Sequence, residues 1–249
     1  MKLKNIGVIL SMIIGITIIG TITLELNQTQ DGADPSAVGL DTVNALLENK
    51  EHVLVVDIRT AEQYQLGHLA GASHDVLDST TMEKRVNTIQ SKLPDVAARY
   101  NFVLVDDDGI QAKQAAQSMT EMGIQTFYLD GGMSNLSENL VTSSSTVIDS
   151  EELMRKLESN ENLYLLDVRQ PDELLESKID GSVNIPLAEI FKPNGMNGIP
   201  TDKPVVVICG SGNRATIASY ALAQEDINFQ ILEGGMTAWN AQIQEKMNK

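Results

Sequence analysis

The stretch VVVICGSGNRATIASYALAQ, residues 205–224, contains the pattern that decides the fold. Its first four residues are aliphatic, and such a continuous run predicts a strand buried on both faces, as in parallel sheets covered by helices. Two glycines follow within CGSGNR, and glycine allows the backbone to turn sharply. Residues 215–224 then predict a helix. The stretch therefore predicts a strand–loop–helix unit of an α/β domain.

A second copy of this unit lies earlier in the chain. FVLVDDDGIQA, residues 102–112, matches VVVICGSGNRA, residues 205–215, at a spacing of 103 positions. LDGGM at residues 129–133 and LEGGM at residues 232–236 keep the same spacing. Because several segments share one spacing, we infer an internal repeat.

The repeat extends toward the amino end at a different spacing. VLVVDIR, residues 53–59, matches LYLLDVR, residues 163–169, at a spacing of 110 positions. The difference of seven places one insertion in the first copy, between Gly71 and Asp106. Each copy predicts the order helix, strand, helix, strand, helix, strand, which favours a parallel β-sheet flanked by helices.

These spacings predict two tandem α/β domains, at residues 40–137 and 147–245, joined by a Ser-rich linker at residues 138–146. Asp41 and Ser150 are predicted to cap the first helix of each domain. Both residue types accept hydrogen bonds from the amides of a first helical turn.

The amino-terminal residues 6–24 form an uncharged stretch behind Lys2 and Lys4. At about 1.5 Å per residue, a helix of this length spans about 28 Å, close to the hydrocarbon thickness of a bilayer. We therefore expect residues 1–25 to be a membrane anchor and residues 26–39 a polar tether. The rest would lie on the extracytoplasmic side, in a periplasm or at the cell surface. A cleaved signal peptide, which would leave a secreted protein, is the alternative.

The composition excludes several classes of function. A formal net charge of −16 in 249 residues disfavours binding to nucleic acid, and membrane contact is expected only through the amino-terminal segment. A single cysteine excludes an internal disulfide and a cysteine zinc cluster. Asp106, Asp107 and Asp108 could suggest calcium, but three consecutive carboxylates diverge and no further ligand pattern follows. We expect neither a metal nor a cofactor.

The candidate site lies at Cys209, where the predicted strand passes into the loop. Successive loop amides and the start of the next helix create a site for an anion there. Such surroundings lower the pKa of a cysteine from about 8.5 toward 6 or below, so we expect a reactive thiolate rather than a buried structural cysteine. The candidate binding groups are the loop amides and the one cation of the loop, in Gly210, Ser211, Gly212, Asn213 and Arg214.

The first copy differs at this site. Asp106 stands at the position of Cys209, and Gln111 stands at that of Arg214. A carboxylate places a fixed negative charge where the loop amides and the helix dipole attract an anion. We therefore expect a degenerate, inactive loop in the first domain.

Several motifs in a fixed order resemble those of the rhodanese family. Cys209, Gly212 and Arg214 match its C-x-x-G-x-R active loop. DVRQPDE at residues 167–173 resembles its D-V-R-x-P-x-E segment, and LEGGMTAW at residues 232–239 its closing G-G-x-x-x-W. The resemblance covers nearly everything outside the predicted anchor and tether. It implies two tandem rhodanese-like domains, the first inactive and the second carrying the cysteine.

The resemblance also implies the activity of a sulfurtransferase of the thiosulfate or 3-mercaptopyruvate class. Cys209 would take a sulfane sulfur from a small donor as a persulfide and pass it to a thiophilic acceptor, such as cyanide, a thiol or a protein thiol. Arg214 would bind the anionic donor or, alternatively, clamp the loop. Asp167 and Arg169 would form a supporting ion pair. The loop is one residue shorter than the C-x5-R loop of phosphatases with this fold, which disfavours phosphate chemistry.

Two other functions remain open. An extracytoplasmic persulfide carrier or redox-sensing module, with little turnover of small donors, needs the same activated Cys209. A purely structural scaffold would require Cys209 to react no faster than a free thiol. The donor is open as well, because Gly210 and Ser211 bring no charge to the loop.

Overall fold

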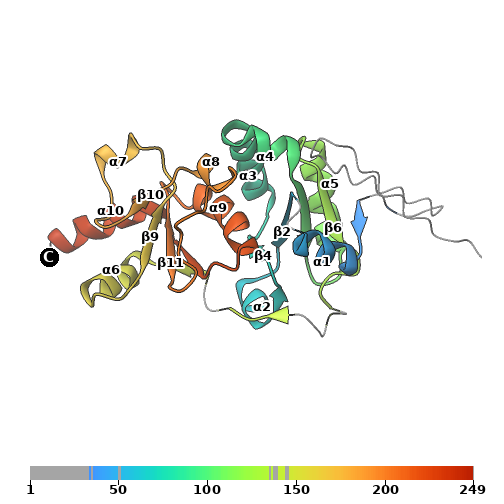
Figure 1. The fold of residues 1–249 in the computed structure, drawn as a ribbon, viewed down its shortest axis with the longest axis horizontal. Helices are drawn as coiled ribbons and strands as arrows, with labels where there is room; N and C mark the ends of the chain where they lie inside the picture. The colour runs from blue at the N-terminus through green and yellow to red at the C-terminus, as the bar shows by residue number, and fades with distance from the viewer. Residues whose placement is uncertain are drawn as a thin grey trace, which may run out of the picture. The chain divides into compact units, whose positions relative to one another are not determined.

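The computed structural model describes residues 34, 36–49, 52–134, 136, 140–143 and 146–248. Residues from Ser36 onward form one compact unit, whose two halves follow each other along the chain (Figure 1). The first half consists of β1 (Ala37–Val38), α1 (Leu40–Glu48), β2 (Val53–Asp57), α2 (Ala61–Leu66), β3 (His68–Leu69), β4 (Ala72–His74), α3 (Ser79–Lys92), α4 (Pro94–Arg99), β5 (Asn101–Val105), α5 (Ile110–Glu121), β6 (Thr126–Leu129) and β7 (Leu140–Val141).

The first half is built on a five-stranded parallel sheet with the order β1-β6-β5-β2-β4. The central strands β2 and β5 pair in register from Val53 with Asn101 to Asp57 with Val105. Every residue of β2 is buried, and so are the last four of β5. Continuous aliphatic strands of this kind need helices on both faces of the sheet, which is what the predicted α/β fold requires.

The second half repeats this arrangement. It consists of β8 (Val147–Ile148), α6 (Ser150–Glu158), β9 (Tyr164–Asp167), α7 (Glu173–Glu176), β10 (Val183–Asn184), α8 (Leu187–Ile190), β11 (Val205–Ile208), α9 (Asn213–Gln224), β12 (Phe229–Leu232) and α10 (Gly235–Met247). Its parallel sheet has the order β10-β9-β11-β12-β8. Read from β8, this is the order of the first sheet with each strand replaced by its counterpart. The predicted fold class, two tandem domains with helix-flanked parallel sheets, is confirmed.

Two short strands were missing from the predicted element order. β1 lies inside the segment predicted as a tether, yet it pairs with β6 and begins the first sheet. β7 lies inside the predicted linker and pairs antiparallel with β3, with His68 opposite Val141. Strands of two residues carry no periodicity of their own, so their partners define them. Other parts of the predicted linker lie outside the described residues.

The predicted membrane anchor at residues 6–24 also lies outside the described residues. Among the residues that are described, no helix combines the length and the apolar character needed to cross a bilayer.

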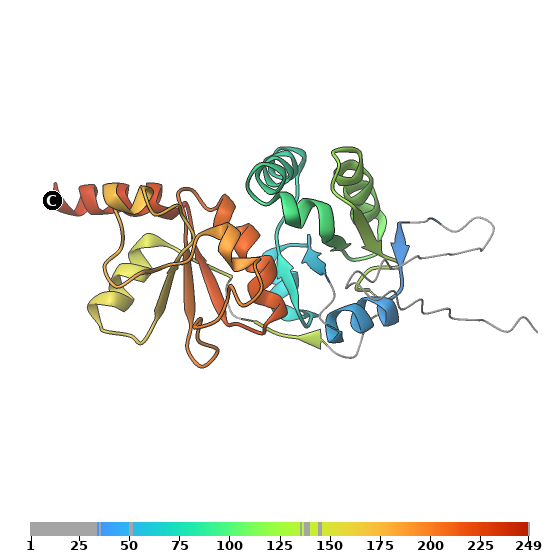
Figure 2. The same ribbon diagram turned by 45° about the horizontal axis from the view of Figure 1, so that its top comes forward.

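Helix α9 is buried on all sides, unlike its counterpart in the first half. Every residue of α9 from 215 to 222 is buried, whereas α5 buries one face. The reason is that α9 packs on its own sheet and also against β4, β2 and α3 of the first half (Figures 1 and 2). Its four alanines allow this close packing, and Ser219 Oγ lies 2.7 Å from Ser73 Oγ of β4.

The two predicted helix caps were wrong by one or two residues. Helix α1 begins at Leu40 with Gly39 as its N-cap, so Asp41 lies inside the first turn. Helix α6 begins at Ser150, and its cap is Asp149, whose Oδ1 accepts a hydrogen bond from the Glu152 amide at 2.7 Å. The Ser150 hydroxyl is buried and has no hydrogen-bond partner among the described residues.

This difference gives a test of the α6 cap. We expect Asp149→Ala to lower the free energy of unfolding by about 1 kcal/mol, the usual cost of losing an N-cap side chain. Ser150→Ala removes an unsatisfied buried hydroxyl and is expected to leave stability unchanged or slightly higher. Urea unfolding of both variants measures this, and a larger loss for Ser150→Ala would contradict the assignment.

Candidate active site

Cys209 lies directly after β11, where the chain turns into α9. The residue is 1% exposed. Among the described residues, one loop amide donates to its sulfur, that of Gly212, with N and Sγ 3.1 Å apart. Gly212 has a φ of 99° and is the N-cap of α9, a conformation that favours glycine. The glycine therefore turns the loop so that an amide faces the sulfur.

The second support of the loop comes from the Gly-Gly pair at the start of α10, where Gly234 is the N-cap and Gly235 the first helical residue. The amide of Met236 donates to the Cys209 carbonyl at 2.8 Å, and that of Thr237 donates to the Gly210 carbonyl at 3.0 Å. A Cβ at Gly235 would clash with the Cys209 carbonyl oxygen. Sequence reasoning used these glycines only as part of a motif. Their physical role is to let the two backbones touch.

Arg214 turns its guanidinium to Glu173 of α7. Nη1 and Nη2 donate to the two carboxylate oxygens at 2.5 and 2.7 Å. The hydrogen bonds from Arg214 lower the pKa of Glu173 to about 2. Partial burial acts in the opposite direction and raises this pKa, whereas the hydrogen bond from the Gln170 amide lowers it further. The same pair raises the pKa of Arg214, to which the nearby Cys209 and Asp167 also contribute. Sequence reasoning missed Glu173 as a partner, although it lies in the DVRQPDE segment. The bidentate geometry favours a clamp on the loop.

The expected ion pair between Asp167 and Arg169 lies beside the cysteine strand. Nε of Arg169 donates to Asp167 Oδ1 at 3.1 Å, and Nη2 donates to Oδ2 at 2.7 Å. Asp57 and Arg59 form the same pair in the first half, at 3.0 and 2.6 Å. Because the pair occurs beside both Cys209 and its aspartate counterpart, it supports the fold in either case.

In the first half, the Asp106 carboxylate fills the concavity of the loop. Oδ1 accepts a hydrogen bond from the Gly109 amide at 2.6 Å. Oδ2 accepts from the amides of Gln111 and Ala112 at 2.8 and 3.0 Å. The Asp106 carbonyl accepts from the Met133 amide at 2.8 Å, as that of Cys209 does from Met236. The two loops therefore share one backbone arrangement around different side chains. Gln111, at the position of Arg214, contributes its backbone amide to the Asp106 carboxylate.

The neighbouring carboxylates have separate partners. Asp107 accepts a hydrogen bond from the Gln63 side chain at 2.8 Å and lies 3.8 Å from Arg59. Asp108 accepts from the Ile110 amide at 3.0 Å. Within the described residues, no three His, Cys, Asp or Glu side chains gather as a metal site would require.

The other loop residues point in different directions. Ser211 is exposed at the tip. The Asn213 side chain contacts the first half, where its Nδ2 donates to Thr88 Oγ1 at 2.7 Å. Of the loop amides predicted to bind at the sulfur, that of Gly212 donates a hydrogen bond to it among the described residues.

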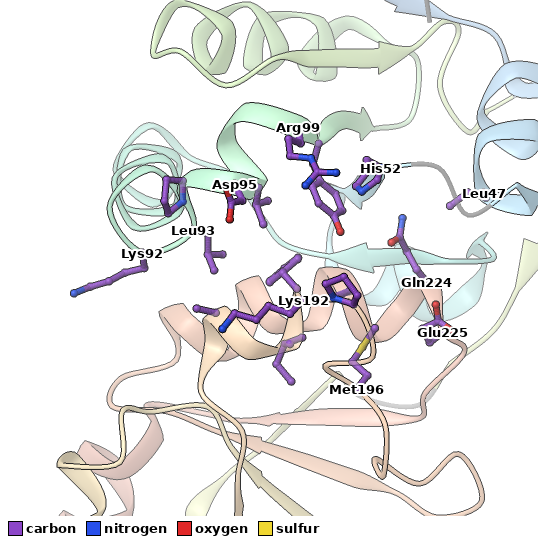
Figure 3. A pocket seen from close by; sticks show the side chains of 18 residues that line it. Leu47, His52, Lys92, Leu93, Asp95, Arg99, Lys192, Met196, Gln224 and Glu225 are labelled. Atoms are coloured by element: carbon purple, nitrogen blue, oxygen red, sulfur yellow. The ribbon is translucent and has the colours of Figure 1, made fainter. Parts of the chain in front are cut away.

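A cavity of about 360 Å³ opens at the far end of α9 (Figure 3). Both halves line it, with Lys92 and Arg99 from the first, Lys192 from the second, and Gln224 from the last turn of α9. Cys209 is not among its lining residues. The cavity is therefore separate from the cysteine loop.

The protein is an α/β protein whose domain occurs twice. In the second domain, a cysteine lies at the turn between a buried strand and the following helix. The family model described as rhodanese-like domain matches residues 40–139 and again residues 149–242. The chain belongs to the rhodanese family and carries two rhodanese-like domains in tandem.

The sequence relatives match a stretch of about one domain's length, whereas one solved structure matches most of the chain. The chain is 35% identical to the putative sulfurtransferase YtwF of Bacillus subtilis over 99 residues, which are 40% of this chain and 94% of that protein. It is 37% identical to a sulfurtransferase of Allochromatium vinosum over 93 residues, 37% of this chain and 85% of the other. The solved structure of SseA from Escherichia coli, described as a 3-mercaptopyruvate sulfotransferase, matches 80% of this chain and 98% of its own at 18% identity and a TM-score of 0.34.

The Glu173–Arg214 clamp predicts a pH-dependent stability. A carboxylate whose pKa falls from 4.5 to about 2 on folding stabilises the folded state above pH 4.5, and this stabilisation disappears as the pH falls toward 2. Because Glu173 is partly exposed, we expect Glu173→Gln to cost about 1–2 kcal/mol at pH 7. Urea unfolding at several pH values should show the two proteins converging in acid. A difference that does not change with pH would contradict the clamp.

The Asp106 loop predicts a loss of stability in the first half. Asp106→Ala leaves three amides without their acceptor, and we expect the free energy of unfolding to fall by about 2–4 kcal/mol, as for other buried, hydrogen-bonded charges. Asp108→Ala, which removes one exposed cap, is the matched control and should cost about 1 kcal/mol or less. Equal losses in the two variants would contradict the assigned role of Asp106.

Proposed function

We propose that this chain is a sulfurtransferase in which Cys209 carries a sulfane sulfur as a persulfide. Membership of the rhodanese family supports the proposal, as do the relatives whose names are sulfurtransferase. The position of Cys209 supports it further, since a strand-end sulfur beside the first amides of a 12-residue helix lies where a negative charge is stabilised.

The observation that carries the proposal is the occupation of the first loop by Asp106. In aspartate, Cβ is followed by Cγ and then by an oxygen; in a cysteine persulfide, Cβ is followed by Sγ and then by the outer sulfur. Counted along the side chain, an oxygen of Asp106 therefore corresponds to the outer sulfur of a persulfide. That oxygen, Oδ2, accepts hydrogen bonds from the amides of Gln111 and Ala112. In the second copy of the repeat, the equivalent residues are Arg214 and Ala215. Their amides would donate hydrogen bonds to the outer sulfur.

The proposed reaction has two steps. The Cys209 thiolate attacks the outer sulfur of a donor, a new S–S bond forms, and the bond in the donor breaks with its electron pair leaving on sulfite or on pyruvate enolate. A thiophilic acceptor then attacks the outer sulfur, and the electron pair of the S–S bond returns to Cys209 as a thiolate. Amides that hold an anionic sulfur stabilise both the persulfide and the regenerated thiolate.

Access to Cys209 requires movement of the loop tip. Cys209 is 1% exposed, whereas Ser211 in the same loop is exposed. The tip lies between Gly210 and Gly212, whose backbones are the least restricted of all residues. We propose that the donor enters when this tip moves outward. The first domain would transfer no sulfur, since Asp106 has no nucleophilic sulfur.

Steady-state transfer of sulfur to cyanide tests the function, with thiosulfate and 3-mercaptopyruvate as alternative donors. Wild-type protein should turn over one of them, and Cys209→Ser should lose about 10³-fold or more of the activity, because the nucleophile is removed. Ser73→Ala, remote from the loop, is the control and should keep the wild-type rate.

Absence of turnover with either donor would overturn the proposed enzyme. In that case persulfide formed on Cys209 by the donor, and passed to a protein thiol in one turnover, would indicate the carrier or redox-sensing function instead. A Cys209→Ser variant as active as wild type would exclude both.

A further inference from the structure

The first half holds the side chain of a residue in the cysteine loop of the second half. Asn213 Oδ1 accepts a hydrogen bond from Nη1 of Arg85, on α3. Asn213 Nδ2 donates to Oγ1 of Thr88, one turn farther along the same helix, at 2.7 Å. Both ends of one amide side chain are therefore bound by a helix that lies 125 and 128 positions earlier in the chain.

Arg85 is itself fixed in place. Its Nε donates to Asp75 Oδ2 at 2.7 Å, and its Nη2 donates to Asp75 Oδ1 at 3.1 Å. Asp75 is buried and also accepts a hydrogen bond from the hydroxyl of Tyr220, on α9, at 2.5 Å. Burial and the neighbouring Asp75 raise the pKa of Tyr220 well above its ordinary value, so that hydroxyl remains a donor. The guanidinium that contacts Asn213 is thus held between the two halves.

The contact matters because of where Asn213 lies. It is the first residue of α9 and follows Gly212, whose amide is the donor to the Cys209 sulfur. Gly212 has no side chain and a left-handed backbone, so it provides no anchor of its own. A fixed side chain at the next position restricts how far the Gly212 amide can turn. Loop geometry at the sulfur therefore depends on the first half.

We propose that Arg85 and Thr88 are positioning residues, through which the first domain holds Asn213 and so keeps the Gly212 amide directed at Cys209. This inference rests on the proposed function of Cys209. It gives the first domain, which has an aspartate in place of the cysteine, a part in the chemistry of the second. The two domains would then form one functional site rather than an active and a silent copy.

The test compares variants that release Asn213 with one that weakens the contact between the halves elsewhere. Asn213→Ala and Arg85→Ala remove the hydrogen bond from opposite ends. Ser73→Ala removes the buried hydrogen bond to Ser219, which does not involve the loop; Ser219 keeps its second partner, the Thr216 carbonyl. The readouts are kcat/KM for sulfur transfer and the pH dependence of Cys209 alkylation by iodoacetamide.

We expect Asn213→Ala and Arg85→Ala each to lower kcat/KM about five- to tenfold, the effect of losing one ordinary hydrogen bond. The midpoint of the alkylation profile should move up by about half to one pH unit, since the thiolate loses a fixed donor. Because Asn213→Ala already removes the contact with Arg85, the double variant should resemble Asn213→Ala. Ser73→Ala should match wild type in both readouts.

Thr88 provides a second pair of variants if Arg85→Ala does not fold. Thr88→Val keeps the shape of the side chain and removes its hydroxyl, so it should show the same shift at a smaller size. Thr88→Ser restores the hydroxyl and should restore the wild-type profile. An unchanged alkylation profile in Asn213→Ala, an additive double variant, or an equal shift in Ser73→Ala would each overturn the proposal.

The alkylation profile does not need turnover. If wild-type protein transfers no sulfur while the profile still shifts in Asn213→Ala, the positioning role stands and the proposed enzyme activity fails. If turnover is normal and neither readout changes in Asn213→Ala, the enzyme stands and the positioning role fails.

Discussion

Backbone amides at the end of a buried strand, where the chain turns into a helix, are the feature on which both domains depend. Donors that face inward and lie beside a helix N-terminus need an acceptor, because buried amides without partners are costly. The first domain supplies a carboxylate, with three amides on Asp106. The second supplies a sulfur, with the Gly212 amide on Cys209. One backbone arrangement thus serves as an internal support in one half and a candidate reaction site in the other.

The burial of α9 joins this arrangement to the rest of the molecule. The helix starts at the cysteine loop, carries Tyr220 to the buried Asp75 of the first half, and ends beside the cavity between the halves. A helix covered on every side has little freedom to shift without disturbing both sheets. The loop therefore begins on a rigid support, and the Glu173–Arg214 pair and the Asn213 contacts hold it from two further directions.

The parallel sheets could be predicted from sequence because the central strands are continuous aliphatic runs and the repeat shows them twice. The short strands β1 and β7 could not, since they have two residues each and are defined by their partners. The candidate site could be proposed from sequence at Cys209 and its glycines, because the strand, the glycine turn and the helix follow one another along the chain. Arg214 and its partner Glu173 are separated by 41 positions in the sequence, and Asn213 and Arg85 by 128. Such contacts depend on how α3, α7 and α9 pack, which no local pattern contains.

The central claim is that the loop at Cys209 accepts an additional sulfur atom where the first loop holds a carboxylate oxygen. Intact-mass spectrometry of the protein after incubation with thiosulfate or 3-mercaptopyruvate tests it most directly. We expect a gain of about 32 Da, the mass of one sulfur in a persulfide, that is located on Cys209 and lost on reduction. An unchanged mass, or the same gain in a protein with serine at this position, would contradict it.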